Sequence, residues 1–277
     1  MIKAEAVSFT YKKKQVFTDF SLSVETGKVC GLLGKNGAGK STLLYLMTGL
    51  LIPQKGKVTY NGENASARKP SVLKEMFIVP EEFELPKMSL KKYLAANRGF
   101  YPNFSEEDLK NNLAHFELDS DINLGALSLG QKKKVFMSFA LATNTPLLIM
   151  DEPTNGLDIP GKSQFKKFIA SKMTDERTII ISTHQVQDVE KLIDQVIIIE
   201  GNKTLLNASV NEITRKLLFA NGEATVDSAT ALYSTPSIQG HNAIYSNNEE
   251  AETELNLETL FNATLANPER INSLFNN

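Results

Sequence analysis

One short stretch constrains the fold of this chain more than any other: residues 34–42 read Gly-Lys-Asn-Gly-Ala-Gly-Lys-Ser-Thr. A glycine, four free positions and then Gly-Lys-Ser/Thr is the phosphate-loop pattern. The apolar residues 28–33 come directly before it and suit a buried parallel strand, while residues 43–47 continue without a breaker, as a helix would. Between a strand and a helix, backbone N–H groups and the helix N-terminus bind phosphates. The sequence therefore predicts that the chain binds a nucleoside triphosphate.

The pattern also assigns roles within the loop. Lys40 would reach the β- and γ-phosphates, and the Ser41 hydroxyl would bind Mg²⁺. The other nucleotide-binding candidates belong to the same glycine-rich backbone: Gly34, Asn36, Gly37, Gly39 and Thr42. A glycine-rich turn with a chance lysine is the alternative, and the flanking strand and helix argue against it.

Composition limits the cellular setting. The chain has 277 residues, a net charge of −2 and one cysteine, Cys30. The balanced charge argues against a strongly basic surface, so we expect no direct nucleic-acid partner. A single cysteine excludes an internal disulfide and fits a reducing compartment. The N-terminus shows no signal peptide and the most apolar window, residues 43–52, is too short to span a bilayer, which predicts a cytoplasmic protein.

Apolar strands alternate with helical patterns along most of the chain. The predicted elements after the loop are helices at 127–143, 161–173 and 186–193, and buried strands at 146–151, 178–182 and 196–200. Such alternation predicts a parallel sheet with helices on both faces. Residues 2–25 alternate apolar and polar positions and predict antiparallel strands, whereas residues 86–123 carry helical spacing and form an insertion.

We therefore expect an α/β fold with a parallel-sheet core, an antiparallel β subdomain and a helical insertion. This domain covers residues 1–218, with its helical subdomain at about 86–142. Residues 219–277 form a small C-terminal α+β appendage. Residues 221–248 are rich in Ser, Thr, Asn and Ala, and a helical pattern returns from residue 257. The helices of this appendage could pack on the core or pair between subunits, and we favour a dimer contact.

Two carboxylates end the apolar strand whose residues 147–152 read Leu-Leu-Ile-Met-Asp-Glu. In phosphate-loop enzymes an acid at this place holds Mg²⁺, which assigns Asp151 to the metal. Glu152 points elsewhere and can polarise the attacking water. Two solvated acids at a strand end are the alternative, and the presence of Lys40 and Ser41 makes it the weaker one.

Residues 127–131, Leu-Ser-Leu-Gly-Gln, come before a helical pattern. Ser128 and Gln131 have capping-box spacing. The free N–H groups and positive end of such a helix make a second anion site, although an ordinary capped helix has the same spacing. Lysines 132–134 follow as a solvated face or as a contact to phosphates or an acidic partner.

Five motifs in order resemble the nucleotide-binding subunit of ATP-binding cassette (ABC) transporters. They are residues 34–42, 127–131, 147–152, Thr-Asn-Gly-Leu-Asp at 154–158 and Ser-Thr-His at 182–184. The resemblance covers about residues 2 to 215. It implies a RecA-like phosphate-loop ATPase that forms a head-to-tail homodimer or heterodimer. Each ATP would lie between one chain's phosphate loop and Ser128, Gly130 and Gln131 of the other.

The resemblance implies three further roles. Asp158 lies in the loop that crosses the dimer interface, His184 contacts and senses the γ-phosphate, and Tyr11 matches the aromatic residue that stacks on adenine. Taken alone, His184 could be a satisfied core histidine, but its place after Ser182-Thr183, near the end of a predicted strand, favours the sensor role. Taken alone, Tyr11 could equally serve packing.

The chain departs from the family pattern at two positions. Glu81 stands where the family has a glutamine that touches Mg²⁺ and the attacking water. A carboxylate is a harder metal ligand than an amide and adds negative charge beside the triphosphate. Leu129 stands where the signature usually has glycine. Neither change removes a residue assigned to the chemistry, so we expect an active ATPase.

The helical insertion, including Phe-Tyr-Pro-Asn-Phe at 100–104, resembles that of bacterial exporters of drugs, antibiotics and peptides. This implies a subunit peripheral to the inner face of the membrane that drives a separate integral membrane permease. We expect an apolar groove near Glu81 to receive that partner. The alternatives are a non-transport ABC ATPase that acts on nucleic acid or ribosomes and a slow-turnover regulatory module that senses ATP.

Overall fold

A computed structural model describes residues 1–227 and 229–275 of the chain. Its first sheet is antiparallel, with strand order β2-β1-β4-β5. The strands are β1 (Ile2–Tyr11), β2 (Lys14–Val24), β4 (Lys55–Tyr60) and β5 (Glu63–Asn64). Side chains of β1 and β2 alternate between buried and exposed, as in a sheet with one face on the core. The predicted antiparallel strands in residues 2–25 are confirmed.

The second sheet has six strands in the order β10-β9-β3-β8-β7-β6. Its strands are β3 (Val29–Leu33), β6 (Met76–Val79), β7 (Leu147–Asp151), β8 (Thr178–Thr183), β9 (Gln195–Glu200) and β10 (Lys203–Ser209). All pair in parallel except β10, which lies antiparallel at the edge. Every residue of β3, β7 and β8 is buried, which confirms the predicted parallel sheet with both faces covered.

Alternate residues of the central strands pack into two separate cores. Cys30 and Leu32 of β3 join the core beneath the antiparallel sheet, together with helix α1 (Lys40–Met47). Val29 and Leu33 join the core on the opposite face, which contains the helical layer. The alternation follows from the two-residue period of a strand. The parallel sheet is therefore the middle layer of the molecule.

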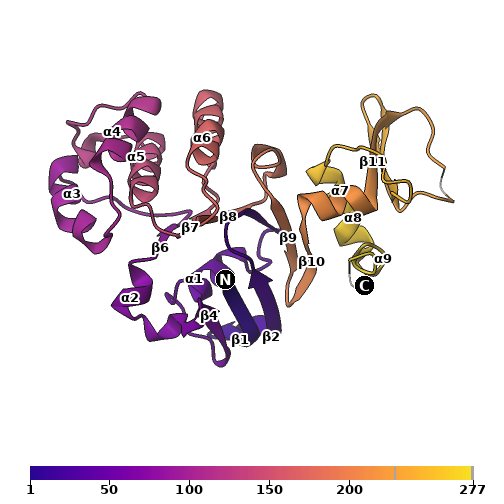
Figure 1. The fold of residues 1–277 in the computed structure, drawn as a ribbon, viewed down its shortest axis with the longest axis horizontal. Helices are drawn as coiled ribbons and strands as arrows, with labels where there is room; N and C mark the ends of the chain where they lie inside the picture. Colours follow the sequence, from indigo (N-terminus) through magenta and orange to yellow (C-terminus); the bar gives the residue numbers. More distant parts are fainter. Residues whose placement is uncertain (228, 276–277) are drawn as a thin grey trace.

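The helical layer and the short connecting helices complete the N-terminal domain. The helices are α2 (Pro70–Leu73), α3 (Leu90–Asn97), α4 (Glu106–His115), α5 (Leu129–Ala142) and α6 (Ile159–Ser171). The 3-10 helices are η1 (Ala65–Ala67), η2 (Arg98–Phe100), η3 (Leu124–Ala126) and η4 (Val186–Asp188). Helices α3, α4 and α5 gather at one end of the molecule, in the region predicted to be a helical insertion (Figure 1).

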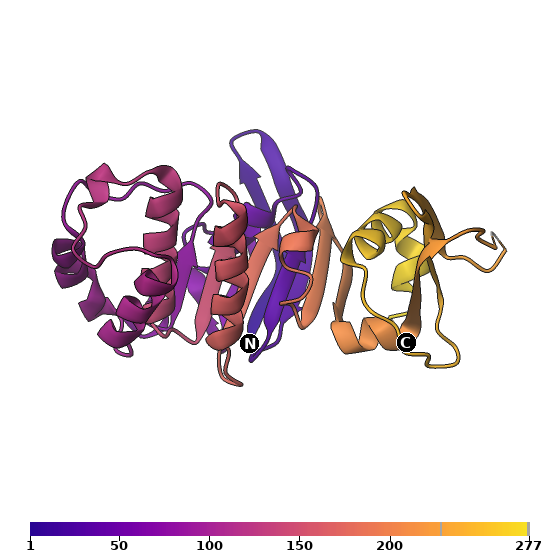
Figure 2. The ribbon, with the colours of Figure 1, turned by 90° about the horizontal axis from the view of Figure 1, so that it is seen from above.

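The C-terminal unit lies at the opposite end in both views (Figures 1 and 2). It consists of α7 (Val210–Lys216), β11 (Leu217–Glu223), β12 (Tyr233–Ser237), β13 (Gly240–Ser246), α8 (Leu257–Ala266) and α9 (Pro268–Asn272). The strands form a sheet with β13 in the middle. Leu257 and Leu260 of α8 are part of the core that contains the helical layer. The unit is thus packed onto the N-terminal domain through α8.

The helix predicted at residues 186–193 is wrong. The segment forms only the single 3-10 turn η4, followed by further turns. So short a helix is marginal without tertiary support. Here its polar side chains bond to other elements instead: Lys162 Nζ donates to Asp188 Oδ2 over 2.7 Å, and Gln187 Nε2 donates to Glu258 Oε2 over 3.0 Å. Tertiary contacts therefore decide the shape of the segment.

Candidate nucleotide-binding site

The phosphate loop connects β3 to α1, as predicted. Gly39 caps α1 with a φ of 99°, in the left-handed region that favours glycine. A Cβ atom added there would lie 2.7 Å from Cζ of Phe17. Gly39 O accepts the first helical hydrogen bond, from Leu43 N, over 2.8 Å. The glycine thus allows the loop to turn sharply into the helix, whose first N–H groups remain free for a ligand.

Lys40 folds back over its own loop. Its ammonium group donates to the carbonyl oxygen of Gly34 over 2.8 Å and lies 3.8 Å from Oε1 of Glu152. The side chain is buried. A buried ammonium group beside a phosphate loop is placed to contact phosphate oxygens, because these acceptors can replace the carbonyl group.

A cavity of about 510 Å³ opens over the loop. Its lining residues are Tyr11, Lys14, Gln15, Val16, Asn36, Gly37, Gly39, Lys40, Ser41, Thr42, Glu81, Glu152, His184 and Gly201. Segments far apart in the sequence therefore meet at one place, and the volume is in the range of cofactor sites. Tyr11 is partly exposed at the wall, with its ring edge-on to Phe9 at 4.8 Å between centroids. Tyr11 is 42% exposed, which is compatible with a stacked base.

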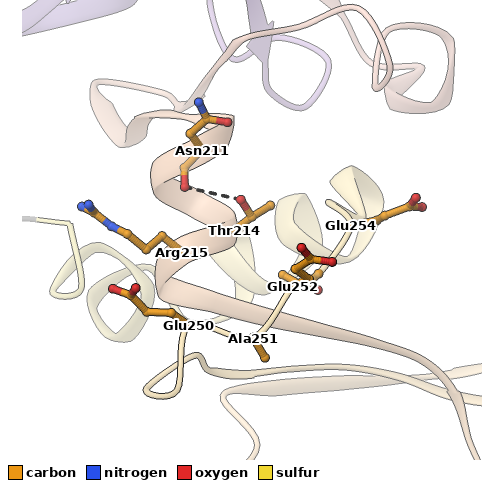
Figure 3. A pocket seen from close by; sticks show the side chains of 8 residues that line it. Asn211, Thr214, Arg215, Glu250, Ala251, Glu252 and Glu254 are labelled. Carbon is orange, nitrogen blue, oxygen red and sulfur yellow. Dashed lines mark hydrogen bonds between the residues drawn. The ribbon is translucent and has the colours of Figure 1, made fainter.

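A second hollow, of about 700 Å³, lies between α7 and residues 250–254 (Figure 3). Its charged side chains are Arg215 and the carboxylates Glu250, Glu252 and Glu254. This excess of negative charge opposes a triphosphate, and the phosphate loop does not line the hollow. We therefore place the nucleotide site in the smaller cavity.

Asp151 ends β7 as a buried carboxylate. Ser182 Oγ donates to its Oδ1 atom, whereas Oδ2 is buried without a hydrogen-bond partner among the described residues. An orphaned carboxylate oxygen is the kind of ligand a hard cation takes. The described residues contain no group of three or more acidic, His or Cys side chains that could hold a metal alone.

Glu152 turns away from Asp151 and toward His184. Its φ of 46° is uncommon outside glycine. Oε1 lies 2.8 Å from Nδ1 of His184, and Oε2 accepts a hydrogen bond from Thr183 Oγ1 over 3.1 Å. Strained backbone that persists at a cavity is typical of functional sites. The structure thus brings together the three residues predicted to be catalytic, Lys40, Glu152 and His184.

Glu81 is linked to the same site by two amide side chains. Asn155 Nδ2 donates to Glu81 Oε1 over 3.0 Å, and Gln185 Nε2 donates to Asn155 Oδ1 over 2.8 Å. The sequence reasoning missed Asn155 and Gln185. Only their positions in the sequence could have pointed to them: Asn155 belongs to the motif at 154–158, and Gln185 follows His184 directly.

The remaining predicted site residues lie elsewhere on the same chain. Among the lining residues that the structure describes, Ser128, Gly130, Gln131 and Asp158 are absent. The capping box is present: Ser128 Oγ accepts from Gln131 N over 3.3 Å, and Gln131 Oε1 accepts from Ser128 N over 3.0 Å. Asp158 caps α6 by accepting from Gly161 N over 3.0 Å. Contact of these residues with a nucleotide stays a prediction, since it requires a second chain.

Comparison with known proteins extends these observations. A model of the ABC transporter family matches residues 17–155. Nod factor export ATP-binding protein I of Rhizobium etli is 33% identical over 218 residues, covering 76% of this chain and 69% of that protein. The SkfA peptide export ATP-binding protein SkfE of Bacillus subtilis is 29% identical over 213 residues, covering 74% and 87%. A solved ATP-binding subunit of an ABC transporter has a TM-score of 0.69 at 25% identity, over 78% of this chain and 92% of that one.

Proposed function

This chain belongs to the ABC transporter family as an ATP-binding ATPase subunit, and from that premise we propose that it hydrolyses Mg²⁺-ATP in a head-to-tail dimer to power export through a separate membrane permease. The observation that carries the proposal is the meeting of Lys40, Glu152 and His184 at one cavity above the phosphate loop. Two relatives are named as export ATP-binding proteins, which supports the direction of transport.

The chemistry follows from the contacts at the cavity. Lys40 would exchange the Gly34 carbonyl and the nearby Glu152 carboxylate for oxygens of the β- and γ-phosphates. Glu152, released from Lys40, would orient the attacking water and accept its proton, while His184 would contact the γ-phosphate. Ser41 and Asp151 would hold Mg²⁺, which when bound offsets the negative charge of the phosphates.

Glu81 would lie beside this metal as an additional carboxylate. It lines the cavity and is held by Asn155. A negative group at this place weakens triphosphate binding by charge repulsion unless a cation is shared with it. The departure from the family's glutamine therefore also supports a second candidate function, a slow-turnover module that senses ATP.

A second copy would complete each site. The N-termini of α5 and α6 present Leu129 and Ile159, which are 71% and 86% exposed. Exposed large apolar side chains near predicted nucleotide-contacting residues fit a surface that a partner covers. The Ser128 helix end is an anion site of about 1 kcal/mol, too weak to hold ATP alone but sufficient to favour a dimer closed over a triphosphate. The partner would be an identical or a homologous subunit.

A membrane partner is required for transport by this chain. In the part of the chain that the structure describes, helices long and apolar enough to cross a bilayer are lacking. We place the subunit at the inner face of the membrane, with its helical end against the permease. Phe100, in the predicted exporter-like segment, is 67% exposed there and would enter the apolar contact.

We also propose that the C-terminal region, residues 219–277, is an accessory region that supports the dimer. Leu257 and Leu260 are buried in the core of their own chain, and Phe261 and Leu265 of α8 pack half-buried against the same core, so only their remaining exposed surface would make such a contact.

Steady-state ATPase activity tests the proposed function. The purified protein with Mg²⁺-ATP should turn over, and Glu152→Gln should lower kcat at least 100-fold, because general-base catalysis contributes about 10²- to 10⁴-fold. Glu176→Gln, an exposed acid outside the site, is the control and should keep the wild-type rate. Equal rates for the wild type and Glu152→Gln would contradict hydrolysis. Tight ATP-driven dimerisation without turnover would favour the sensor.

Docking of the permease is tested by Phe100→Asp. The charge should abolish co-purification with a multi-span membrane protein while leaving ATP binding unchanged, because Phe100 does not line the nucleotide cavity. Ile52→Asp is the matched control, since Ile52 is similarly exposed, at 63%, and follows α1 rather than lying in the helical subdomain. Retained co-purification of Phe100→Asp, or equal loss in both variants, would rule out this docking surface.

A further inference from the structure

Lys133, in the second turn of α5, is a buried charged residue that the proposed mechanism does not use. It is 4% exposed, although lysine is rarely buried without a partner. Its Nζ atom donates to the backbone carbonyl oxygens of Glu152, over 2.7 Å, and of Asn155, over 2.9 Å. The ammonium group thus joins α5 to both ends of the turn that follows β7.

This turn carries the proposed base. Asn155 N donates to Glu152 O over 3.2 Å, so that carbonyl accepts hydrogen bonds from both the turn and the lysine. Glu152 has left-handed backbone, which persists only where surrounding contacts hold it. The two lysine bonds are such contacts. Without them the turn can relax, and the carboxylate would move relative to His184.

Burying the charged Lys133 side chain costs desolvation free energy, which an apolar side chain of similar size would not. Desolvation lowers the pKa of Lys133. The nearby carboxylates oppose this shift, and Glu81 has a larger effect than Glu152. A methionine would fill similar volume without placing a charge in the interior. The neighbouring Lys132 and Lys134 remain partly exposed on the same helix. Of these three lysines, only Lys133 points from α5 into the interior, toward the turn after β7.

We propose that Lys133 is a positioning residue: its ammonium group clamps the turn from Glu152 to Asn155 and holds the Glu152 carboxylate, the proposed base, in its reactive orientation. Asn155 also bonds to Glu81 and Gln185 through its side chain, so the clamp bears on both linked segments. This inference rests on the proposed dimer. There, the start of α5 would contact one nucleotide and Glu152 would act at the other, so Lys133 would link the two nucleotide sites through one chain.

The test compares Lys133→Met with the wild type in steady-state ATPase assays and in ATP binding. Methionine has an unbranched side chain, one atom shorter than that of lysine, and lacks the donors. We expect kcat to fall at least tenfold while the affinity for ATP changes less than twofold, because Lys133 does not line the cavity. Lys133→Arg, which keeps donors, should recover at least half of the logarithmic loss. Lys167→Met, on an exposed part of α6, is the control and should not change kcat.

A second comparison separates positioning from a general loss of structure. In a Glu152→Gln background, Lys133→Met should change the residual rate less than twofold, since the group it positions is already missing. A further tenfold loss there would overturn the proposal, as would a wild-type kcat for Lys133→Met. If the methionine variant does not fold, Lys133→Gln decides by the same two criteria. An inactive wild type contradicts the proposed function instead, so the two failures are distinguishable.

Discussion

Glu152 occupies a place where three side chains compete for one carboxylate. Its Oε1 atom lies 2.8 Å from Nδ1 of His184 and 3.8 Å from Nζ of Lys40, while Oε2 accepts from Thr183. In the proposed mechanism, Lys40 and His184 are also the residues that would contact the phosphates. Binding of ATP would replace these pairs by phosphate contacts and leave the carboxylate for water. The proposed switch between the two states is therefore an exchange of partners within a few ångströms.

Cys30 provides a test of the core at the scale of one residue. It is fully buried in β3, where it donates from Sγ to Gln195 Oε1 over 3.1 Å. Desolvation, reinforced by Asp194, raises the pKa of the thiol to about 12. The folded protein therefore keeps this proton above the ordinary thiol pKa of about 8.5, at which the unfolded chain loses it. The resulting stability is present below that value and is lost as the pH rises toward 12.

We expect the free energy of unfolding to fall more steeply between pH 9 and 11 in the wild type than in Cys30→Ala. The difference in slope should approach 1.4 kcal/mol per pH unit, to an order of magnitude. Tyr60 and Tyr93, whose pKa burial also raises to about 12, are present in both proteins and cancel. Urea unfolding at several pH values measures the slopes. Parallel curves for the two proteins would show that the thiol is not buried as described.

At the scale of elements, the start of α1 depends on a glycine that no other residue can replace without movement. Gly39→Ala would force alanine into left-handed backbone, at about 1–2 kcal/mol, and bring Cβ to 2.7 Å from the Phe17 ring. We expect a lower melting temperature and at least tenfold weaker ATP binding by calorimetry. Gly99→Ala, where an added Cβ meets open space, should leave both unchanged. Wild-type ATP affinity in Gly39→Ala would refute the role of this turn.

Elements with strong local signals could be predicted from the sequence. The phosphate loop, the buried strands β3, β7 and β8 and the capping box of α5 each rest on residues within one short segment. The positions and pairing of the strands in the C-terminal α+β unit could not, because these strands pair over long separations, as Leu217 does with Ser246. Segment 186–193 failed as a helix for a similar reason: its partners, Lys162 and Glu258, lie on other elements.

The residues of the candidate site also divide into those that could be predicted from local motifs and those that could not. Lys40, Asp151 and Glu152 belong to motifs whose chemistry is local, whereas the function of Lys133 could not be seen in a row of three lysines. Only the packing of α5 against the turn after β7 shows which of the three points inward. Asn155 likewise becomes part of the site through contacts to Glu81 and Gln185, from two other segments.

At the scale of the whole molecule, the site lies between two end units. The helical subdomain occupies one end and the C-terminal unit the other (Figure 2). The C-terminal unit reaches the segment after His184: Leu257 N donates to Glu190 Oε2 over 2.8 Å, and Glu258 accepts from Gln187 over 3.0 Å. A movement of His184 on nucleotide binding would therefore be transmitted to α8 through these hydrogen bonds. A dimer contact in this unit would report on the same event.

The central claim is that ATP joins two copies because each supplies half of its binding site. The measurement that tests it most directly is the mass in solution of Glu152→Gln, determined by light scattering with and without Mg²⁺-ATP. A monomer without nucleotide and a dimer with it are predicted, and Ser128→Arg, which places a bulky side chain at the start of α5, should prevent the dimer. A hydrolysis-blocked protein that binds ATP and remains monomeric would contradict the account.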